Sequence, residues 1–139
     1  MPPETPDSTD PKEWMRRVRS NLARARDVSG VPDVLYEDLC FDAQQAAEKA
    51  IKAVLVKAGK PYPKTHVIER LLGLAVEAGA EVGPDIREAA ILSDYATVAR
   101  YPGPGEEVTA EEHSRAVELG EKLVWAESQL ADQVDSGSE

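Results

Sequence analysis

The chain has 139 residues, of which 42% are apolar and 30% are charged, and its formal net charge is −10. A chain of this size fits one domain that buries its own core without disulfides or a structural metal. The acidic balance argues against general, non-specific binding to nucleic acid, which needs clustered cations, although it leaves room for a local basic patch.

The two ends of the chain differ in composition from the rest. Residues 1–9 are rich in Pro, Thr and acidic residues, and residues 135–139 read Asp-Ser-Gly-Ser-Glu. Such segments bury too little apolar surface to fold, so we expect a disordered arm at 1–9 and a disordered tail at 135–139. The sequence thus predicts a single helical domain over residues 10–134.

The first two helices are predicted from apolar spacing and terminal signals. The first runs from about residue 11 to 28, with Asp10 as its N-cap and Glu13 three residues later, which predicts a capping box. The second is the longest, from about residue 33 to 58, and Gly59 supplies its stop.

The second helix has an apolar face that is unusually wide and rich in alanine. Glu48 precedes Lys52 by four residues, a spacing that supports a helix through side-chain pairing. A face this wide contacts more than one neighbour, and we take it as a sign of homodimerisation.

Three further helices complete the predicted domain. The third spans about 66–78 with Thr65 as its cap, and the fourth runs from Pro84 to about Arg100. The fifth opens with a capping box formed by Thr109 and Glu112. Because no segment alternates apolar and polar residues with a period of two, the predicted fold class is all-α, an up-and-down helical bundle of about five helices.

One candidate ligand site lies at the start of the third helix. A helix N-terminus offers free N–H groups and the positive end of the dipole, and Lys64 and His66 add side chains that bind anions. Arg100 would reach the same phosphate if the fourth helix ends nearby. In the alternative interpretation Thr65 caps the helix, His66 bonds a nearby carboxylate or carbonyl, and Lys64 is solvated.

A second candidate group consists of Asp94, Tyr95, Arg100 and Tyr101. Tyr101 is placed to stack on a base, and Tyr95 to pack in the core with its hydroxyl at the rim. In the alternative interpretation, Arg100 and Asp94 form an ion pair that fixes the end of the helix. Both interpretations stay open.

Polar residues of the second and fifth predicted helices are further candidates for chemistry. Gln44, Gln45, Glu48 and Lys49 are either solvated surface or the lining of a groove shared in a dimer. The acidic and histidine residues at 111–113 are adjacent rather than spaced three or four apart, so we predict no metal site. The sequence also lacks a phosphate-binding glycine loop, so we predict no cofactor.

The compartment is predicted from cysteine usage and hydropathy. Cys40 is the single cysteine, so an internal disulfide is excluded, and no apolar run is long enough for a membrane span. The N-terminus has neither the basic start nor the apolar core of a signal peptide. We therefore expect a cytoplasmic protein that keeps Cys40 as a buried apolar residue.

Four stretches give the chain a family resemblance: FDAQQAAEKAIKAVL at 41–55, YPKTH at 62–66, Asp94-Tyr95, and RYP at 100–102. Together they resemble a HEPN domain over about residues 10–132. The resemblance implies a bundle of about five helices that dimerises. Many HEPN proteins are encoded beside a small nucleotidyltransferase as one half of a toxin–antitoxin pair, others are thought to bind nucleotides, and many are metal-independent endoribonucleases.

The ribonuclease activity of the family depends on an Arg separated from a His by four to six residues. Residues 59–61, before His66, are Gly-Lys-Pro, and residues 106–108, before His113, are Glu-Glu-Val. The motif is therefore absent. Lys60 with His66 is the one conceivable substitute, but lysine lacks the bidentate fork of arginine.

These observations predict a non-catalytic, HEPN-type nucleotide- or RNA-binding and interaction protein, a homodimer that partners a small nucleotidyltransferase in a toxin–antitoxin-like pair. The alternatives are a divergent metal-independent endoribonuclease and a dimerisation module with no small ligand. We predict no catalytic residue, no metal and no cofactor. The candidate ligand-binding residues are Lys64, His66, Asp94, Tyr95, Arg100 and Tyr101.

Overall fold

The structure is a computed structural model that describes residues 9–27, 33–98 and 107–137. All regular structure in these ranges is helical, in five segments, which confirms the predicted all-α class. The segments are α1 (Pro11–Arg26); α2 (Tyr36–Lys57); α3 (Ile68–Glu77); α4 (Pro84–Arg87) with the 3-10 helix η1 (Glu88–Asp94) and α5 (Tyr95–Val98); and α6 (Ala110–Lys122) with the 3-10 helix η2 (Leu123–Trp125) and α7 (Ala126–Gly137).

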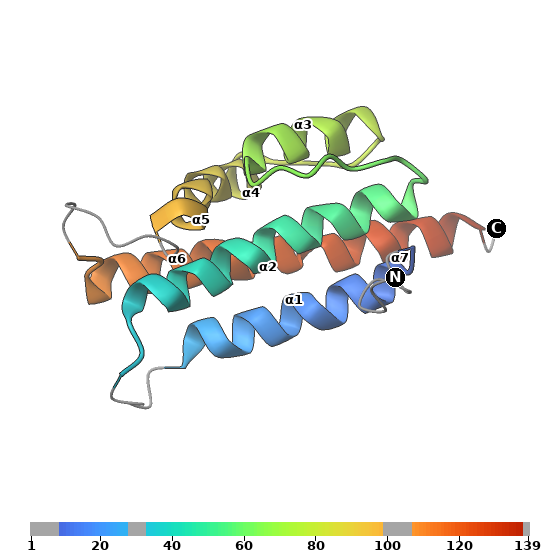
Figure 1. The fold of residues 1–139 in the computed structure, drawn as a ribbon. Helices are drawn as coiled ribbons and strands as arrows, with labels where there is room; N and C mark the ends of the chain where they lie inside the picture. The colour runs from blue at the N-terminus through green and yellow to red at the C-terminus, as the bar shows by residue number, and fades with distance from the viewer. Residues whose placement is uncertain (1–8, 28–32, 99–106, 138–139) are drawn as a thin grey trace, which may run out of the picture.

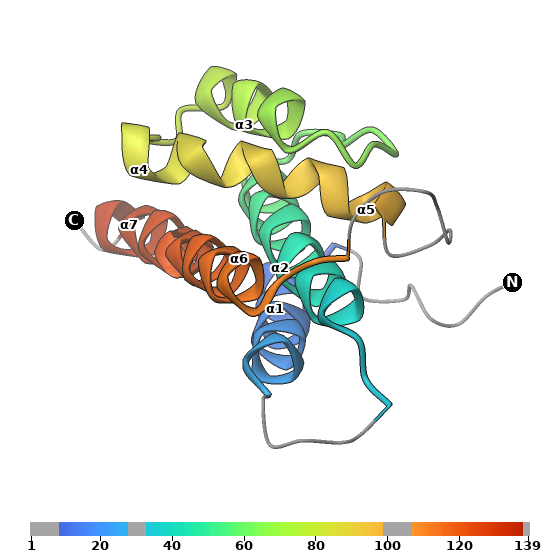
Figure 2. The ribbon, with the colours of Figure 1, turned by 90° about the vertical axis from the view of Figure 1, so that its left-hand side faces the viewer.

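Helix α2 is the centre of the bundle. In Figure 2, α1 lies on one side of α2, the α4-to-α5 segment crosses the opposite side, and α3 lies outermost. Small side chains let the neighbours approach closely: a Cβ added at Gly120 of α6 would lie 3.2 Å from the carbonyl oxygen of Ala43. The core is built from apolar residues of every segment, among them Leu22, Ile51, Leu55, Ile68, Leu71, Leu92, Leu119 and Leu123.

The wide apolar face of α2 is covered within a single chain. Its alanines and its larger apolar side chains, such as Ile51 and Leu55, are fully buried against α1, α3, α5 and α6. The width of this face therefore gives no reason for a homodimer, which stays a prediction based on the family resemblance.

Of the predicted caps, the one at α6 is confirmed in full and the one at α1 in part. At α6 the Glu112 N–H donates to Thr109 Oγ1 (3.1 Å) and the Thr109 N–H donates to Glu112 Oε1 (2.9 Å), which confirms that capping box. At α1, Asp10 is the N-cap but accepts from the Lys12 N–H, while Glu13 pairs with arginines further along the helix, so the predicted box is wrong.

Helix α3 begins two residues later than predicted, and Thr65 is not its cap. The N-cap is Val67, whose N–H donates to Thr65 Oγ1 (3.1 Å). The next N–H, that of Ile68, donates to Ser93 Oγ of η1 (2.8 Å). The side chain that satisfies the first turn of α3 is thus Ser93, a residue 25 positions away that local spacing does not indicate.

The connection from α2 to α3 sets the position of the candidate site. After Gly59, which has φ +73°, the chain runs back along α2 before α3 starts (Figure 1). This return places His66 beside Glu48, near the middle of α2. Helix α7 extends to Gly137, three residues into the segment that we expected to be a tail.

Candidate functional site

The candidate site is built around the carboxylate of Glu48, whose residue is only 6% exposed. Glu48 Oε1 accepts hydrogen bonds from His66 Nδ1 (3.0 Å), Gln44 Nε2 (2.8 Å) and Gln45 Nε2 (3.3 Å). Glu48 Oε2 accepts from Lys52 Nζ (2.8 Å). One buried carboxylate therefore holds four donors, and both of its oxygens are engaged by side chains of the protein.

The Glu48 carboxylate is anionic at neutral pH. Burial alone would raise its pKa, but the hydrogen bonds from His66, Lys52 and Gln44 outweigh burial, so the pKa lies below its ordinary value. A buried carboxylate is tolerated in proteins when it is paired and hydrogen-bonded in this way.

The Glu48 carboxylate fixes the orientation of the His66 ring. Because an ionised carboxylate only accepts hydrogen bonds, the proton of the neutral imidazole resides on Nδ1 and the lone pair on Nε2. The His66 side chain is 46% exposed, whereas that of Glu48 is 7% exposed. The imidazole is thus anchored on one side and accessible on the other.

Two aromatic rings connect the Lys52 end of this cluster to α1. The Lys52 ammonium lies 5.5 Å from the centre of the Tyr62 ring, a cation–π contact. The edge-to-face contact between Tyr62 and Trp14 of α1 has a centroid distance of 5.4 Å. These contacts hold the return segment against both α1 and α2, so the position of His66 is set by packing as well as by its hydrogen bond.

The segments that carry the two predicted groups of ligand residues meet at one point, where the Ile68 N–H donates to Ser93 Oγ (2.8 Å). Lys64 and Asp94 are exposed, and Arg100 and Tyr101 fall outside the described residues. Tyr95 is half-buried and shares a hydrogen bond with Cys40. Cys40 and Glu48 are eight residues apart on α2, about 12 Å along its axis. Tyr95 and His66 therefore contact α2 at separate points.

The Cys40–Tyr95 pair is a buried pair without reactive character. Burial raises the pKa of the Cys40 thiol to about 12, although the hydrogen bond from Tyr95 acts in the opposite direction. Burial also raises the pKa of Tyr95 to about 12, and the neighbouring Cys40 and Glu112 add to the effect. The thiol therefore behaves as the apolar filler that the sequence suggested.

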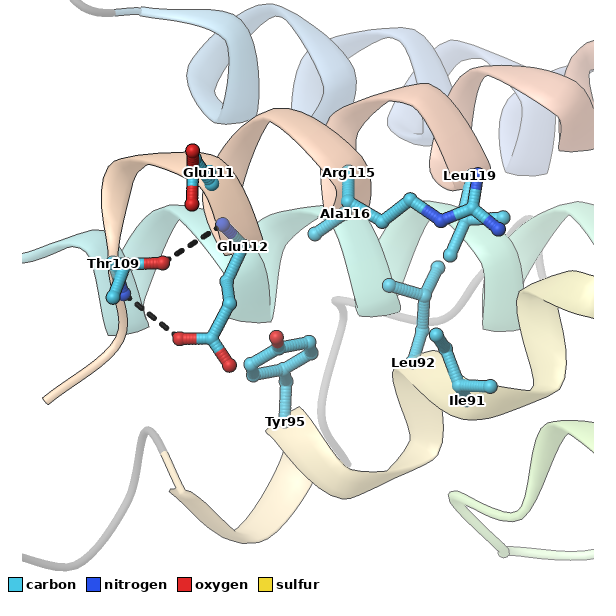
Figure 3. Close-up of a pocket in the computed structure, with 9 residues that line it drawn as sticks. All are labelled: Ile91, Leu92, Tyr95, Thr109, Glu111, Glu112, Arg115, Ala116 and Leu119. Carbon is cyan, nitrogen blue, oxygen red and sulfur yellow. Dashed lines mark hydrogen bonds between the residues drawn. The ribbon is translucent and has the colours of Figure 1, made fainter. Parts of the chain in front are cut away.

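A pocket of about 290 Å³ opens beside Tyr95, between the η1–α5 segment and α6 (Figure 3). Figure 3 shows the Tyr95 ring on its wall next to the Glu112 side chain that belongs to the capping box. The remaining lining residues are Ile91, Leu92, Thr109, Glu111, Arg115, Ala116 and Leu119. The pocket is a separate feature from the cluster around Glu48.

Residue spacing on α2 contains a signal for the buried carboxylate that the sequence analysis missed. Cys40, Gln44, Glu48, Ile51 and Leu55 recur every three or four residues, so the two polar residues continue an apolar stripe. All five are buried in the structure. Polar residues inside such a stripe predict a buried polar network, here with His66 as the partner from a distant segment.

Buried His113 is the second histidine that finds a structural partner. It is 4% exposed, its Nε2 lies 2.6 Å from the carbonyl oxygen of Ala25, and its ring stacks on Tyr36. This histidine links α6 to the end of α1 and lies away from His66.

Comparison with known proteins assigns the fold. The sequence profile of the HEPN domain matches residues 11–129. The chain belongs to the HEPN domain family. The crystal structure of TT1696 from Thermus thermophilus is 33% identical, with a TM-score of 0.76 over 88% of this chain and 99% of that one. ST0689, described as an archaeal HEPN homologue, is 28% identical, with a TM-score of 0.66 over 86% of this chain and 97% of that one. No curated protein matches the sequence.

The described part of this HEPN domain shows neither a metal site nor a membrane-spanning helix. In the described ranges, no group of three or more His, Cys, Asp or Glu side chains is arranged to hold a metal ion. Likewise, none of the helices observed combines the length and the apolar character needed to cross a membrane.

Proposed function

We propose that this HEPN-domain protein binds a nucleotide or RNA without cleaving it, with His66 and Lys64 as ligand contacts. We further propose that it forms a homodimer and is the partner of a small nucleotidyltransferase in a toxin–antitoxin-like pair. The observation that carries the binding proposal is the anchoring of His66 by the buried Glu48 carboxylate, at 3.0 Å. The partner and the homodimer rest on the family resemblance.

The chemistry of the two residues suits a nucleotide. The exposed ammonium of Lys64 is a donor for a phosphate, and the accessible Nε2 of His66 accepts a hydrogen bond from a ribose hydroxyl or a base amino group. The two residues are next but one in the chain, and the Glu48 anchor keeps the imidazole from turning away. A fixed side chain loses little conformational entropy on binding.

The charge balance around His66 favours binding over cleavage. RNA cleavage through the 2′-hydroxyl needs a base and a cation that stabilises the charge on the phosphate. The cation of the cluster is Lys52, and its charge is neutralised by Glu48 Oε2 at 2.8 Å while Tyr62 covers it on another side. The sequence also lacks the Arg–His spacing of the family's ribonucleases.

One observation favours the endoribonuclease as the second candidate. A carboxylate that accepts from His Nδ1 orients the imidazole with Nε2 free to take a proton, which is how enzymes build a general base. The Glu48–His66 pair has this arrangement. The two candidates therefore use the same residues and differ in whether the RNA is cut.

The test is to measure binding and integrity of the same RNA in EDTA. A labelled single-stranded RNA is titrated with wild-type protein, His66→Ala, Lys64→Ala and Lys57→Ala, the last an exposed lysine of α2 that serves as the charge-matched control. We expect intact RNA in every case. Binding should be about tenfold weaker for Lys64→Ala, since a hydrogen bond to a charged group contributes about 1.5 kcal/mol, and about fivefold weaker for His66→Ala, whose bond to a neutral donor contributes about 1 kcal/mol.

Each other outcome selects a different function. Cleavage in EDTA that His66→Ala abolishes establishes the endoribonuclease. Absence of binding to RNA and to nucleotides leaves the dimerisation module. Sedimentation at micromolar concentration tests the homodimer, and co-expression with a nucleotidyltransferase encoded by a neighbouring gene tests the pair.

A further inference from the structure

A second polar cluster lies on the seam between α1 and α2, centred on Lys49. The Lys49 ammonium is half-buried and donates to Asn21 Oδ1 (3.0 Å). Asn21 is 3% exposed, and its Nδ2 donates to Asp42 Oδ1 (3.0 Å). Within the described part of the chain, no carboxylate forms an ion pair with Lys49, so the partner of this cation is a neutral amide.

Two arginines place further positive charge next to Lys49. Arg17, Asn21 and Arg24 recur at four and three residues, so they lie on one face of α1. Burial is the main cause that lowers the pKa of Lys49, and the nearby Arg17 and Arg24 lower it further, while the charges of Glu48 and Asp42 act in the opposite direction. Both guanidinium groups are at least half exposed.

The acidic residues nearby neutralise this charge only in part. Asp42 accepts from Arg24 Nη2 (2.7 Å), and Glu13 accepts from Arg17 Nε (3.0 Å). Glu13 is shared with Arg16, which also donates to it. Arg16 and Arg17 thus share one carboxylate, and no carboxylate of the described residues forms an ion pair with Lys49. The seam therefore keeps a local excess of positive charge on a protein whose net charge is −10.

A half-buried cation bonded to an amide is a favourable position for an oxyanion. Burial of a charge is costly unless an opposite charge accompanies it. Lys49 has three N–H donors and gives one to Asn21, and Arg17 uses its Nε for Glu13, so donors remain on both side chains. A phosphate group accepts several such charge-assisted hydrogen bonds at once.

We infer that Lys49, together with Arg17 and Arg24, binds a backbone phosphate of the same single-stranded RNA whose neighbouring nucleotide contacts His66. This inference rests on the proposed function for the identity of the ligand. The two sites are neighbours on α2, because Lys49 follows Glu48 in the chain, and Gln45, one turn before Lys49, donates to Glu48 Oε1, the oxygen that holds His66. The preferred ligand is therefore a strand with several phosphates rather than a mononucleotide.

The salt dependence of RNA binding tests this inference. Each phosphate contact on a single strand contributes about 0.7 to the slope of log K against log salt. We expect Lys49→Gln and Arg17→Gln each to lower that slope, by at most about 0.7 because they share one phosphate, Lys49→Arg to keep it, and the control Lys57→Gln to leave it unchanged. Arg17 is an exposed residue outside the core, so its variant reports on the site independently of any change in folding that Lys49→Gln causes.

The failure of this inference and the failure of the proposed function give different results. If His66→Ala weakens binding while Lys49→Gln and Arg17→Gln keep the wild-type slope, the Lys49 site is wrong and the His66 site stands. If the wild-type protein binds no RNA strand, both are wrong.

Discussion

Replacing Glu48 with Gln tests the network that holds the candidate site. The substitution keeps the size and shape of the side chain but removes its charge. The Lys52 ammonium, 11% exposed in its side chain, then loses the carboxylate at 2.8 Å, and His66 loses its anionic acceptor. The perturbation therefore leaves a nearly buried cation without its counter-charge.

The expected cost follows from this burial. Removing one partner of a buried ion pair destabilises a protein by about 3 kcal/mol or more, because the remaining charge is uncompensated. For 139 residues the entropy of unfolding near the midpoint is about 0.3 kcal/mol per kelvin, so Tm falls by about 10 °C.

Thermal and urea unfolding followed by circular dichroism measure the change. Glu69→Gln is the matched control, since Glu69 is exposed on α3 and its loss of charge changes the free energy of unfolding by less than about 0.5 kcal/mol. A cost below about 1 kcal/mol for Glu48→Gln would refute the reasoning, because it would mean that the carboxylate is solvated and does not hold Lys52 and His66.

Four further predictions concern Glu48, two glycines and Cys40. The pKa of Glu48 is lowered in the folded state, so the folded protein binds fewer protons than the unfolded chain. The stability from this group is complete well above about pH 4.3 and is lost as pH falls through the lowered pKa. Urea titrations at several pH values will show that the free energy of unfolding falls more steeply with acid in wild type than in Glu48→Gln. Gly120→Ala will destabilise the fold by about 1–3 kcal/mol, because its new methyl group meets the backbone of Ala43 at 3.2 Å. Gly73→Ala, a helix position with open space around it, will stabilise by about 0.5–1 kcal/mol, and thermal melts compare the two. Cys40 will react with a thiol reagent at pH 8 only at the rate of unfolding, since burial raises its pKa to about 12, and rapid labelling of the native protein would contradict this.

The sequence predicts the helices well because their signals are local. The capping box of Thr109 and Glu112, the stop at Gly59 and the apolar stripes each depend on residues within one or two turns. The predicted box at Asp10 fails because Glu13 faces arginines one turn further along the helix, which bind its carboxylate more strongly than a backbone N–H does.

The candidate site is less predictable because its contacts join distant segments. His66 can be selected from the sequence, but its partner lies 18 positions earlier, and the return of the chain along α2 decides the contact. Glu48 and Lys52 have the spacing of an ordinary ion pair on a helix surface. They differ from such a pair because both are buried, which the spacing does not reveal. The same holds for Lys49, whose half-buried position and amide partner depend on how α1 packs against α2.

Nitrogen-15 NMR of the His66 ring, with and without RNA, tests the central claim most directly. The Glu48 anchor predicts that the neutral form of the ring carries its proton on Nδ1, and that the Nε2 resonance shifts when a single-stranded RNA saturates the site. A neutral form with its proton on Nε2, or an Nε2 resonance that does not move at saturating RNA, would contradict the account.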